Sequence, residues 1–136
     1  MSAATVDDLK GLPLFAELDE TELHELGPWF EVKQVSDGVR LVGEGASGYT
    51  FFVIVDGSAL VTAGGAEVAT LGSGDFFGEF ALLGSGRRQA TVTTTAPTRV
   101  VVMFGTEFRR LEQAHPSIAA KIEAAMQKRA AELERA

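Results

Sequence analysis

Apolar residues follow three successive patterns along the chain, and each pattern predicts a different kind of structure. Before Pro28, leucines recur at short intervals, as at Leu18, Leu23 and Leu26, which predicts short helices with one buried side. Between residues 29 and 104, short apolar runs are separated by turn residues, which predicts strands. Helical spacing returns after residue 105. We therefore expect helices, then strands, then helices again.

The central region is expected to form several short strands. Glycine pairs and Asp-Gly steps, such as Gly64-Gly65 and Asp56-Gly57, separate the apolar runs. Many short strands with closely spaced turns are typical of a barrel or jelly roll, and the chain shows no strand–helix–strand alternation. The predicted strands lie near Phe30–Val35, Arg40–Val42, Phe51–Val55, Ala59–Thr62, Val68–Leu71, Ala90–Thr94 and Arg99–Phe104.

Three residues mark the expected helix boundaries. Asp19 is suited to cap a helix that Pro28 ends, Thr106 to cap a second one, and Pro116 to be the first residue of a third. In the last helix, apolar residues recur at three- and four-residue steps and form one stripe, with charged residues on the other face. The stripe consists of Ile118, Ile122, Ala125, Met126, Ala130 and Leu133.

These patterns predict a mainly β fold with flanking helices, namely a jelly-roll-like β-roll with N-terminal helices and two C-terminal helices. A length of 136 residues fits one domain, so we expect a single domain over residues 1–136. Within it, residues 1–28 form the N-terminal helices, residues 29–104 the β-roll, and residues 105–136 the C-terminal helices.

Composition and charge exclude several classes of function. The absence of cysteine excludes disulfide scaffolds and thiolate metal sites, and the only two histidines lie apart from each other, so we expect no metal site. The net charge of −7 argues against a broad nucleic-acid surface. No apolar run is long enough to span a bilayer, and the N-terminus lacks the pattern of a secretory signal. A cytoplasmic protein is expected.

The most informative stretch begins with Gly74-Asp75-Phe76-Phe77-Gly78-Glu79 and ends with an arginine that leads a strand. A short helical turn starting near Gly78 would offer free N–H groups to an anion, and Arg88 can hold the same anion with two parallel hydrogen bonds. The carboxylate of Glu79 would repel a phosphate but can accept hydrogen bonds from a sugar hydroxyl. The residue types therefore suggest a ligand with both phosphate and sugar. Arg87 is expected to face solvent.

This stretch closely resembles the phosphate-binding cassette of cyclic-nucleotide-binding domains, in which F-G-E-(apolar)-A-L is followed, after a loop, by R-x-A-(T/S)-V. Residues 77–82 and 88–92 match both parts, Phe77-Gly78-Glu79-Phe80-Ala81-Leu82 and Arg88-Gln89-Ala90-Thr91-Val92. Upstream glycine motifs match too, and the resemblance covers nearly the whole chain. It implies a double-stranded β-helix with its cassette at residues 77–91, and a sensor that binds cAMP, or less favourably cGMP, and is not an enzyme.

The resemblance also implies roles for individual residues. Arg88 would pair with the exocyclic phosphate oxygens, Glu79 would accept from the ribose 2′-hydroxyl, and backbone N–H groups near Phe80 and Ala81 would meet the phosphate or ribose. The last helix corresponds to the family's mobile lid. The full set of implied ligand-binding residues is Phe77, Gly78, Glu79, Phe80, Ala81, Arg88, Gln89 and Ala90, with a base wall of Val61, Val68 and Met126.

One departure from the family pattern bears on the ligand. Gln89 stands where cAMP sites of the family usually have Ala, and its amide can reach the phosphate, reach a guanine amino group, or point to solvent. cGMP therefore stays open beside cAMP. The alternative function is a degenerate copy of the fold that binds a protein and no ligand. A cupin-like enzyme is set aside because both histidines lie on the flanking helices.

The resemblance further implies what the sensor works with. No cofactor is expected beyond the nucleotide ligand. The expected partner is a protein effector or a fused effector domain that responds to the ligand, and a homodimer through the C-terminal helix is left open. Direct binding to nucleic acid or to a membrane is not expected, because the chain is acidic and shows no module for either.

Overall fold

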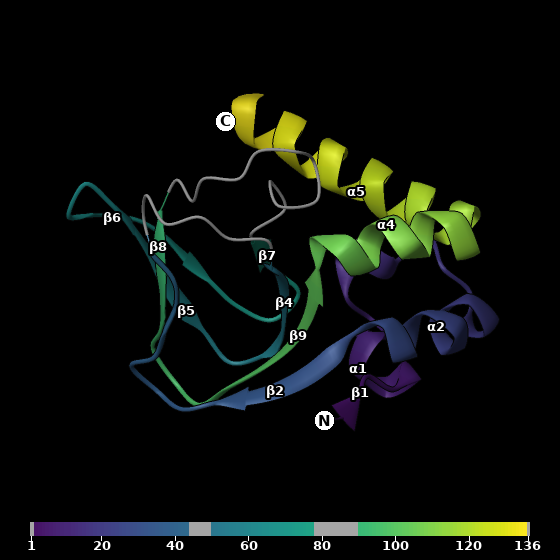
Figure 1. Ribbon diagram of the computed structural model, residues 1–136. Coiled ribbons are helices and arrows are strands. Elements are labelled where there is room, and N and C mark those ends of the chain that lie inside the picture. Colours follow the sequence, from purple (N-terminus) through teal and green to yellow (C-terminus); the bar gives the residue numbers. More distant parts are fainter. Residues whose placement is uncertain (1, 44–49, 78–89, 136) are drawn as a thin grey trace.

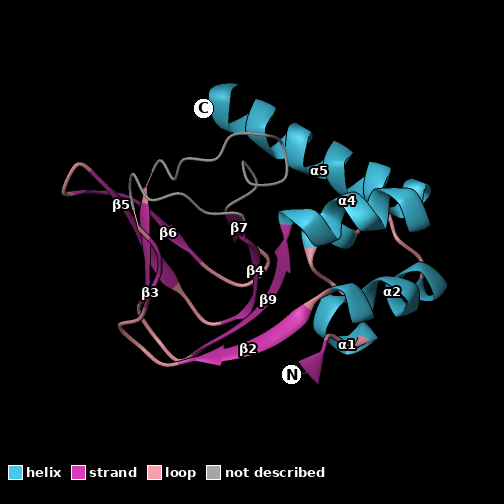
Figure 2. Ribbon diagram, in the orientation of Figure 1, coloured by secondary structure: helices cyan, strands magenta, loops and turns pink. Residues whose placement is uncertain are grey.

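The computed structural model describes residues 2–43, 50–77 and 90–135. Two antiparallel sheets lie beside a group of helices (Figures 1 and 2). One sheet has the strand order β1-β2-β9-β4-β7 and the other the order β3-β8-β5-β6. The strands are β1 (Ser2–Ala3), β2 (Glu31–Val35), β3 (Arg40–Val42), β4 (Thr50–Asp56), β5 (Ala59–Ala63), β6 (Ala66–Leu71), β7 (Phe76–Phe77), β8 (Thr91–Thr94) and β9 (Thr98–Phe104). The helical elements are α1 (Val6–Leu9), η1 (Pro13–Phe15), α2 (Glu20–Leu26), η2 (Gly27–Trp29), α4 (Gly105–Ala114) and α5 (Pro116–Arg135).

The predicted fold class, mainly β with flanking helices, is confirmed. Each predicted strand is present, with ends that differ from the prediction by at most two residues. The structure adds β1 and β7, which are too short to show an alternating pattern in the sequence. The prediction that Thr106 caps a helix is wrong. Helix α4 begins one residue earlier, at Gly105, and the residue before it, Phe104, makes no side-chain cap.

The two central strands of the larger sheet separate two hydrophobic cores. Because side chains alternate along a strand, successive residues of β4 and β9 point to opposite faces of the sheet. One face is covered by the helices and the other by the smaller sheet, which explains the unbroken apolar runs in both strands. Phe51, Val53, Val101 and Met103 belong to the core under the helices, and Phe52, Ile54, Val100 and Val102 to the core between the sheets.

The caps of the N-terminal helices follow local sequence rules. The predicted cap at Asp19 is confirmed: its side chain accepts a hydrogen bond of 2.8 Å from the backbone N–H of Glu22, and Glu22 accepts one of 3.1 Å in return. Thr5 and Asp8 form the same reciprocal arrangement at the start of α1. Pro116 is the first residue of α5, as predicted.

Asp8 joins the N-terminal helix to the larger sheet. Its side chain is only 9% exposed, and its Oδ1 lies 2.9 Å from Nε and 2.8 Å from Nη2 of Arg99, on β9. Burial raises the pKa of Asp8, but the backbone N–H of Thr5, which donates at 2.9 Å, and the Arg99 guanidinium outweigh that effect. The pKa of Asp8 therefore lies below its ordinary value of 3.8.

The lowered pKa of Asp8 predicts a specific loss of stability in acid. In the window below 3.8 the unfolded chain binds more protons at this group than the folded one, so stability falls as pH falls through the folded pKa. Thermal melts between pH 7 and 2.5 should show a steeper acid decline for the wild type than for Asp8→Asn. The exposed neighbour Asp7 gives the control: Asp7→Asn should retain the wild-type slope, and equal slopes for all three would contradict the prediction.

Gly57, between β4 and β5, sits against the start of β9. Its φ is +116°, and an added Cβ would lie 2.5 Å from Oγ1 and 2.7 Å from Cα of Thr98. Gly38 also has a positive φ, +79°, but no atom would lie within 4 Å of its Cβ. An alanine would be strained by the positive φ at either position, but only at Gly57 would it also meet Thr98, so Gly57→Ala should lower the free energy of unfolding by about 1–3 kcal/mol more than Gly38→Ala. Urea unfolding of the two variants measures the difference, and equal losses would show that the contact with Thr98 relaxes freely.

Candidate functional site

The described residues on either side of the predicted cassette belong to different sheets. Phe77 ends β7, pairs with Phe52 of β4 and stacks on its ring at 4.8 Å. Ala90 immediately precedes β8, whose Thr91 pairs with Thr62 of β5. The predicted site therefore begins on the larger sheet and ends on the smaller one. The side chain of Phe77 is buried in the core between the sheets, and Ala90 is half-buried.

A tight turn fixes the strand that leads into the cassette. The backbone N–H of Gly72 donates to Oδ2 of Asp75 at 2.8 Å, and Ile54 of β4 exchanges backbone hydrogen bonds with Asp75 and Gly74 at 2.8 and 2.7 Å. Gly74 has a φ of +89°, and a Cβ there would lie 2.8 Å from Cδ of Pro13. Asp75 has no role in the prediction made from the sequence. The Gly-Ser-Gly-Asp sequence at residues 72–75 was the available signal, because Asp side chains in turns often accept hydrogen bonds from nearby backbone N–H groups.

Val61 and Val68, predicted to line the base, lie on neighbouring strands. Val61 of β5 pairs with Ala69 of β6, while the next residue, Thr62, pairs with Glu67. Val68 is thus the extra residue of a β-bulge, and bulges often redirect side chains next to binding sites. Val68 is 62% exposed, whereas Val61 is half-buried against the core between the sheets. An apolar side chain exposed to this extent offers a free contact surface.

Met126, the third predicted base contact, is a core side chain in this structure. It is 1% exposed and belongs to the core under the helices, together with Ile118 and Ile122 of the same stripe and with Ala119. The described side chains of the stripe therefore pack against the N-terminal helices and the larger sheet. A contact between Met126 and a base stays a prediction.

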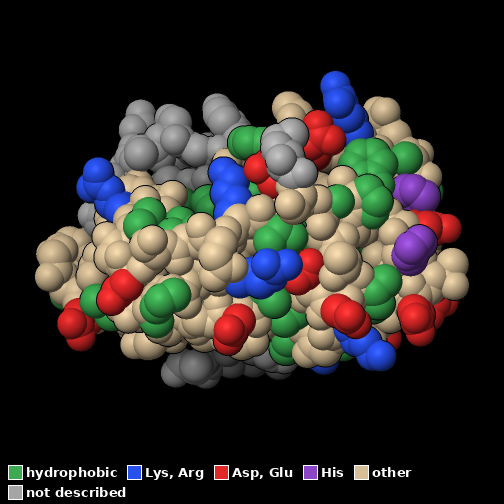
Figure 3. All heavy atoms as spheres, turned by 90° about the horizontal axis from the view of Figure 1, so that it is seen from below, with side chains coloured by type: hydrophobic (Ala, Val, Ile, Leu, Met, Phe, Trp, Pro, Cys, Tyr) green, Lys and Arg blue, Asp and Glu red, His purple; other side chains and the backbone are tan. Residues whose placement is uncertain are grey.

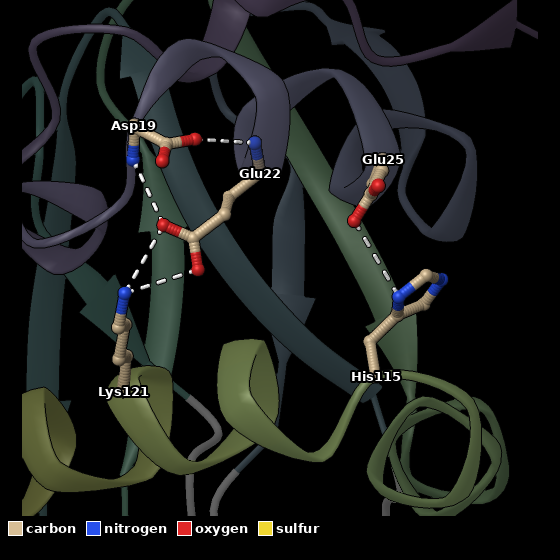
Figure 4. A network of polar contacts seen from close by, with 5 residues as sticks. All are labelled: Asp19, Glu22, Glu25, His115 and Lys121. Carbon is tan, nitrogen blue, oxygen red and sulfur yellow. Dashed lines mark hydrogen bonds and ion pairs between the residues drawn. The ribbon is translucent and has the colours of Figure 1, made fainter.

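Polar contacts also hold α5 and its start against the N-terminal helix α2 (Figure 4). Nζ of Lys121 lies 3.1 and 3.0 Å from the two carboxylate oxygens of Glu22, the same carboxylate that accepts from the backbone of Asp19. At the junction of α4 and α5, Nδ1 of His115 lies 3.6 Å from Glu25. These contacts join residues about 100 positions apart in the sequence. Helix α5 is therefore held by apolar contacts on its buried face and by ion pairs at the edge of that face.

The remaining predicted ligand residues lie outside the described residues. They are Gly78, Glu79, Phe80, Ala81, Arg88 and Gln89. Phe77 ends β7 and Ala90 immediately precedes β8, the two strands that border the cassette. Val61 lies on β5, the neighbour of β8, Val68 lies on β6, and Met126 belongs to the core under the helices. The assignment of all these residues to ligand binding stays a prediction.

Comparison with known proteins settles the family. The family model described as "Cyclic nucleotide-binding domain" matches residues 32–115, more than half of the chain. The chain belongs to the cyclic nucleotide-binding domain family. The recognition made from the sequence motifs is thereby confirmed, and the family is one of regulatory binding modules.

Relatives and solved structures agree with this membership. The cAMP-dependent protein kinase regulatory subunit of Yarrowia lipolytica is 37% identical over 105 residues, covering 76% of this chain and 28% of that protein. The cGMP-dependent protein kinase of Eimeria tenella is 36% identical over 88 residues, covering 65% and 9%. The structure of cAMP-bound PfPKA-R aligns with a TM-score of 0.80 at 28% identity, covering 96% of this chain and 44% of that one. The domain therefore has the β-roll fold of the family, and it spans about a quarter or less of the curated relatives it matches.

Within the described ranges, no three His, Asp or Glu side chains are grouped so that they could hold a metal ion. No described helix is both long and apolar enough to cross a membrane. On the face shown in Figure 3, acidic, basic and apolar side chains are interspersed.

Proposed function

We propose that this domain is a cyclic-nucleotide sensor that prefers cAMP and catalyses no reaction. The observation that carries the proposal is the intact cassette, Phe77-Gly78-Glu79 through Arg88-Gln89-Ala90, within the residues matched by the family. Its described ends are attached to two different sheets, so a ligand held by both ends of the cassette would sit between them.

The proposed chemistry is recognition of a phosphate and a sugar. Arg88 would bind the exocyclic phosphate oxygens through two parallel charge-assisted hydrogen bonds, and Glu79 would accept from the ribose 2′-hydroxyl. Backbone N–H groups after Gly78 would add to the anion site, where a Cβ would obstruct a close approach of the phosphate. A domain that had become a ligand-free protein-binding copy would not need to keep both Glu79 and Arg88.

The proposed preference for cAMP rests on the base wall. Val61 and Val68 are apolar, and the exposed side chain of Val68 lies on the strand beside Val61. Apolar walls favour an adenine face and offer no partner to the exocyclic amino group of guanine. The side-chain amide oxygen of Gln89, in the cassette, could supply such a partner.

Calorimetric titrations of cAMP and cGMP, run side by side, test this function. We expect saturable binding of both with tighter binding of cAMP. Equal or tighter binding of cGMP would overturn the preference and point to Gln89 as a guanine contact, which Gln89→Ala would then reverse. The absence of heat with either nucleotide would favour the degenerate, protein-binding alternative.

The proposed output is a change in the position of α5. Nucleotide binding would draw this helix towards the ligand, where Ile122, Met126 or Arg129 covers the base; the side chain of Arg129 lies outside the described residues. A ligand shifts such an equilibrium only by binding one position better than the other. A protein effector, or a further domain of a longer chain, would then respond to the position of α5.

A further inference from the structure

A cavity lies between the N-terminal segment η1 and the last helix α5. Its volume is about 460 Å³, within the range of about 300–1,000 Å³ that is usual for small-molecule sites. Pro13 and Leu14 line one wall, Phe76 of β7 lines another, and Ala124 and Ala125 of α5 complete the apolar surface. It shares no described lining residue with the predicted nucleotide site.

Charged side chains stand around this apolar surface. Lys121 and Lys128 line the cavity from α5, and their spacing of seven residues places them on one face of the helix, two turns apart. Lys121 is held by Glu22 at 3.0 Å, whereas Lys128 is exposed and makes no ion pair with any residue in the described part of the chain. Glu17 contributes a single exposed carboxylate to the lining.

We propose that this cavity is a second ligand site, which takes a small amphiphilic anion. The apolar body of the ligand packs against Pro13, Leu14 and Phe76, and its carboxylate or sulfonate pairs with the ammonium of Lys128. Two short alanine side chains leave room for the ligand along the helix, and the long lysine stem lets its charge reach the acid group from the rim. Glu17 opposes the anion and limits its affinity.

The site has a consequence for the proposed sensor. Its walls come from η1, from α5 and from β7, which ends one residue before Gly78. A ligand in the cavity would therefore contact α5 and also the elements relative to which α5 is proposed to move. This consequence, unlike the site itself, rests on the proposed function. Where two ligands are linked through one protein, each changes the affinity of the other by the same factor.

The first test uses 8-anilinonaphthalene-1-sulfonate (ANS), a fluorescent amphiphilic anion, titrated into the folded protein without nucleotide. We expect one saturable site, from which decanoate displaces the probe. Lys128→Gln should weaken ANS binding by about fivefold and Glu17→Gln should strengthen it by about twofold, as expected for single exposed charges. Lys33→Gln, an exposed lysine on β2, is the control and should leave the affinity unchanged. Equal effects of Lys128→Gln and Lys33→Gln would overturn the proposal.

The second test fills the cavity. Ala124 and Ala120 are both exposed residues of α5, but only Ala124 lines the cavity. Ala124→Leu should therefore weaken ANS binding by more than about tenfold, because the added side chain occupies the apolar space that the probe needs. Ala120→Leu makes the same substitution on the same helix and should bind ANS as the wild type does. Thermal melts of both variants check that each is folded at the titration temperature.

A third test, in which ANS is titrated in the presence of cAMP, distinguishes this site from the predicted nucleotide site. If ANS occupied the nucleotide site, its apparent Kd would rise in proportion to the cAMP concentration without limit. At a separate site the Kd of ANS instead reaches a plateau, and the ratio of plateau to starting value equals the change in cAMP affinity at saturating ANS. Unlimited competition overturns the second site. A protein that binds ANS as described but no cAMP would overturn the proposed function and leave the second site standing.

Discussion

Arg88→Ala is expected to weaken cAMP binding about thirty- to several-thousand-fold while the domain stays folded. The guanidinium is the proposed counter-charge of the cyclic phosphate, and removing one partner of a buried charge pair costs on the order of 2–5 kcal/mol. Most of that cost arises because the phosphate would still lose its water on binding without gaining two charge-assisted hydrogen bonds. Isothermal titration of cAMP into both proteins measures the change.

Arg87→Ala is the matched control for Arg88→Ala. It removes the same charge one position earlier, and Arg87 is expected to face solvent because successive residues of a strand point to opposite faces. Its effect on cAMP affinity should be below about fivefold, the range of a screened surface charge. If both variants bind cAMP alike, the register of the predicted site is wrong by one residue. Matching thermal melts would exclude unfolding as the cause.

Local chemistry explains why much of the fold was predictable. A capping carboxylate such as Asp19 and a proline such as Pro116 act on backbone groups within one helical turn, so their effects are visible in the sequence alone. The strands β4 and β9 were predictable because each is buried on both faces and therefore reads as an unbroken apolar run. The prediction failed at Thr106 because α4 begins at Gly105 without a side-chain cap, and nothing nearby in the sequence reveals this.

Features that depend on distant contacts could not be predicted. β7 is only two residues long, and it exists because a turn at Gly74, packed against Pro13, aligns it with β4. The stripe on α5 indicated an apolar face, but periodicity does not tell which surface covers a face. The partner of that face, and the ion pair between Lys121 and Glu22, arise from residues far apart in the chain.

The candidate site also has a part that the sequence could predict and a part that it could not. The cassette is a continuous stretch of sequence, so its residue types and spacing could be interpreted directly and led to the family that the comparisons show. The base wall is built from separate strands. Only the pairing of β5 with β6 reveals that Val68 is an exposed bulge residue beside Val61, while Met126 lies in a different core.

Met126→Ala is expected to lower the free energy of unfolding by about 2–5 kcal/mol, because truncating a fully buried side chain removes its contacts and leaves a cavity. The side chain is 1% exposed in the core that joins α5 to the N-terminal helices. The neighbouring Gln127 is exposed, so Gln127→Ala should change stability by less than about 0.5 kcal/mol. Urea unfolding without nucleotide gives both values. A loss below about 1 kcal/mol for Met126→Ala would show that the buried contacts of α5 contribute little to stability.

The same helix supplies the test of the proposed output. If cAMP draws α5 into a more closed position, amides between Ile118 and Leu133 should exchange more slowly in the presence of cAMP, and a tenfold slowing corresponds to about 1.4 kcal/mol. The buried contacts of Met126 oppose such a movement, because α5 must exchange one set of buried contacts for another. Met126→Ala removes some of these buried contacts. It should therefore speed amide hydrogen exchange in α5 without ligand and enlarge the protection gained on cAMP binding. Hydrogen exchange at protein concentrations where the oligomeric state is constant resolves the two positions. Protection confined to residues 78–81 and 88–91 would make α5 a fixed strut, and the domain would then bind nucleotide without a moving lid.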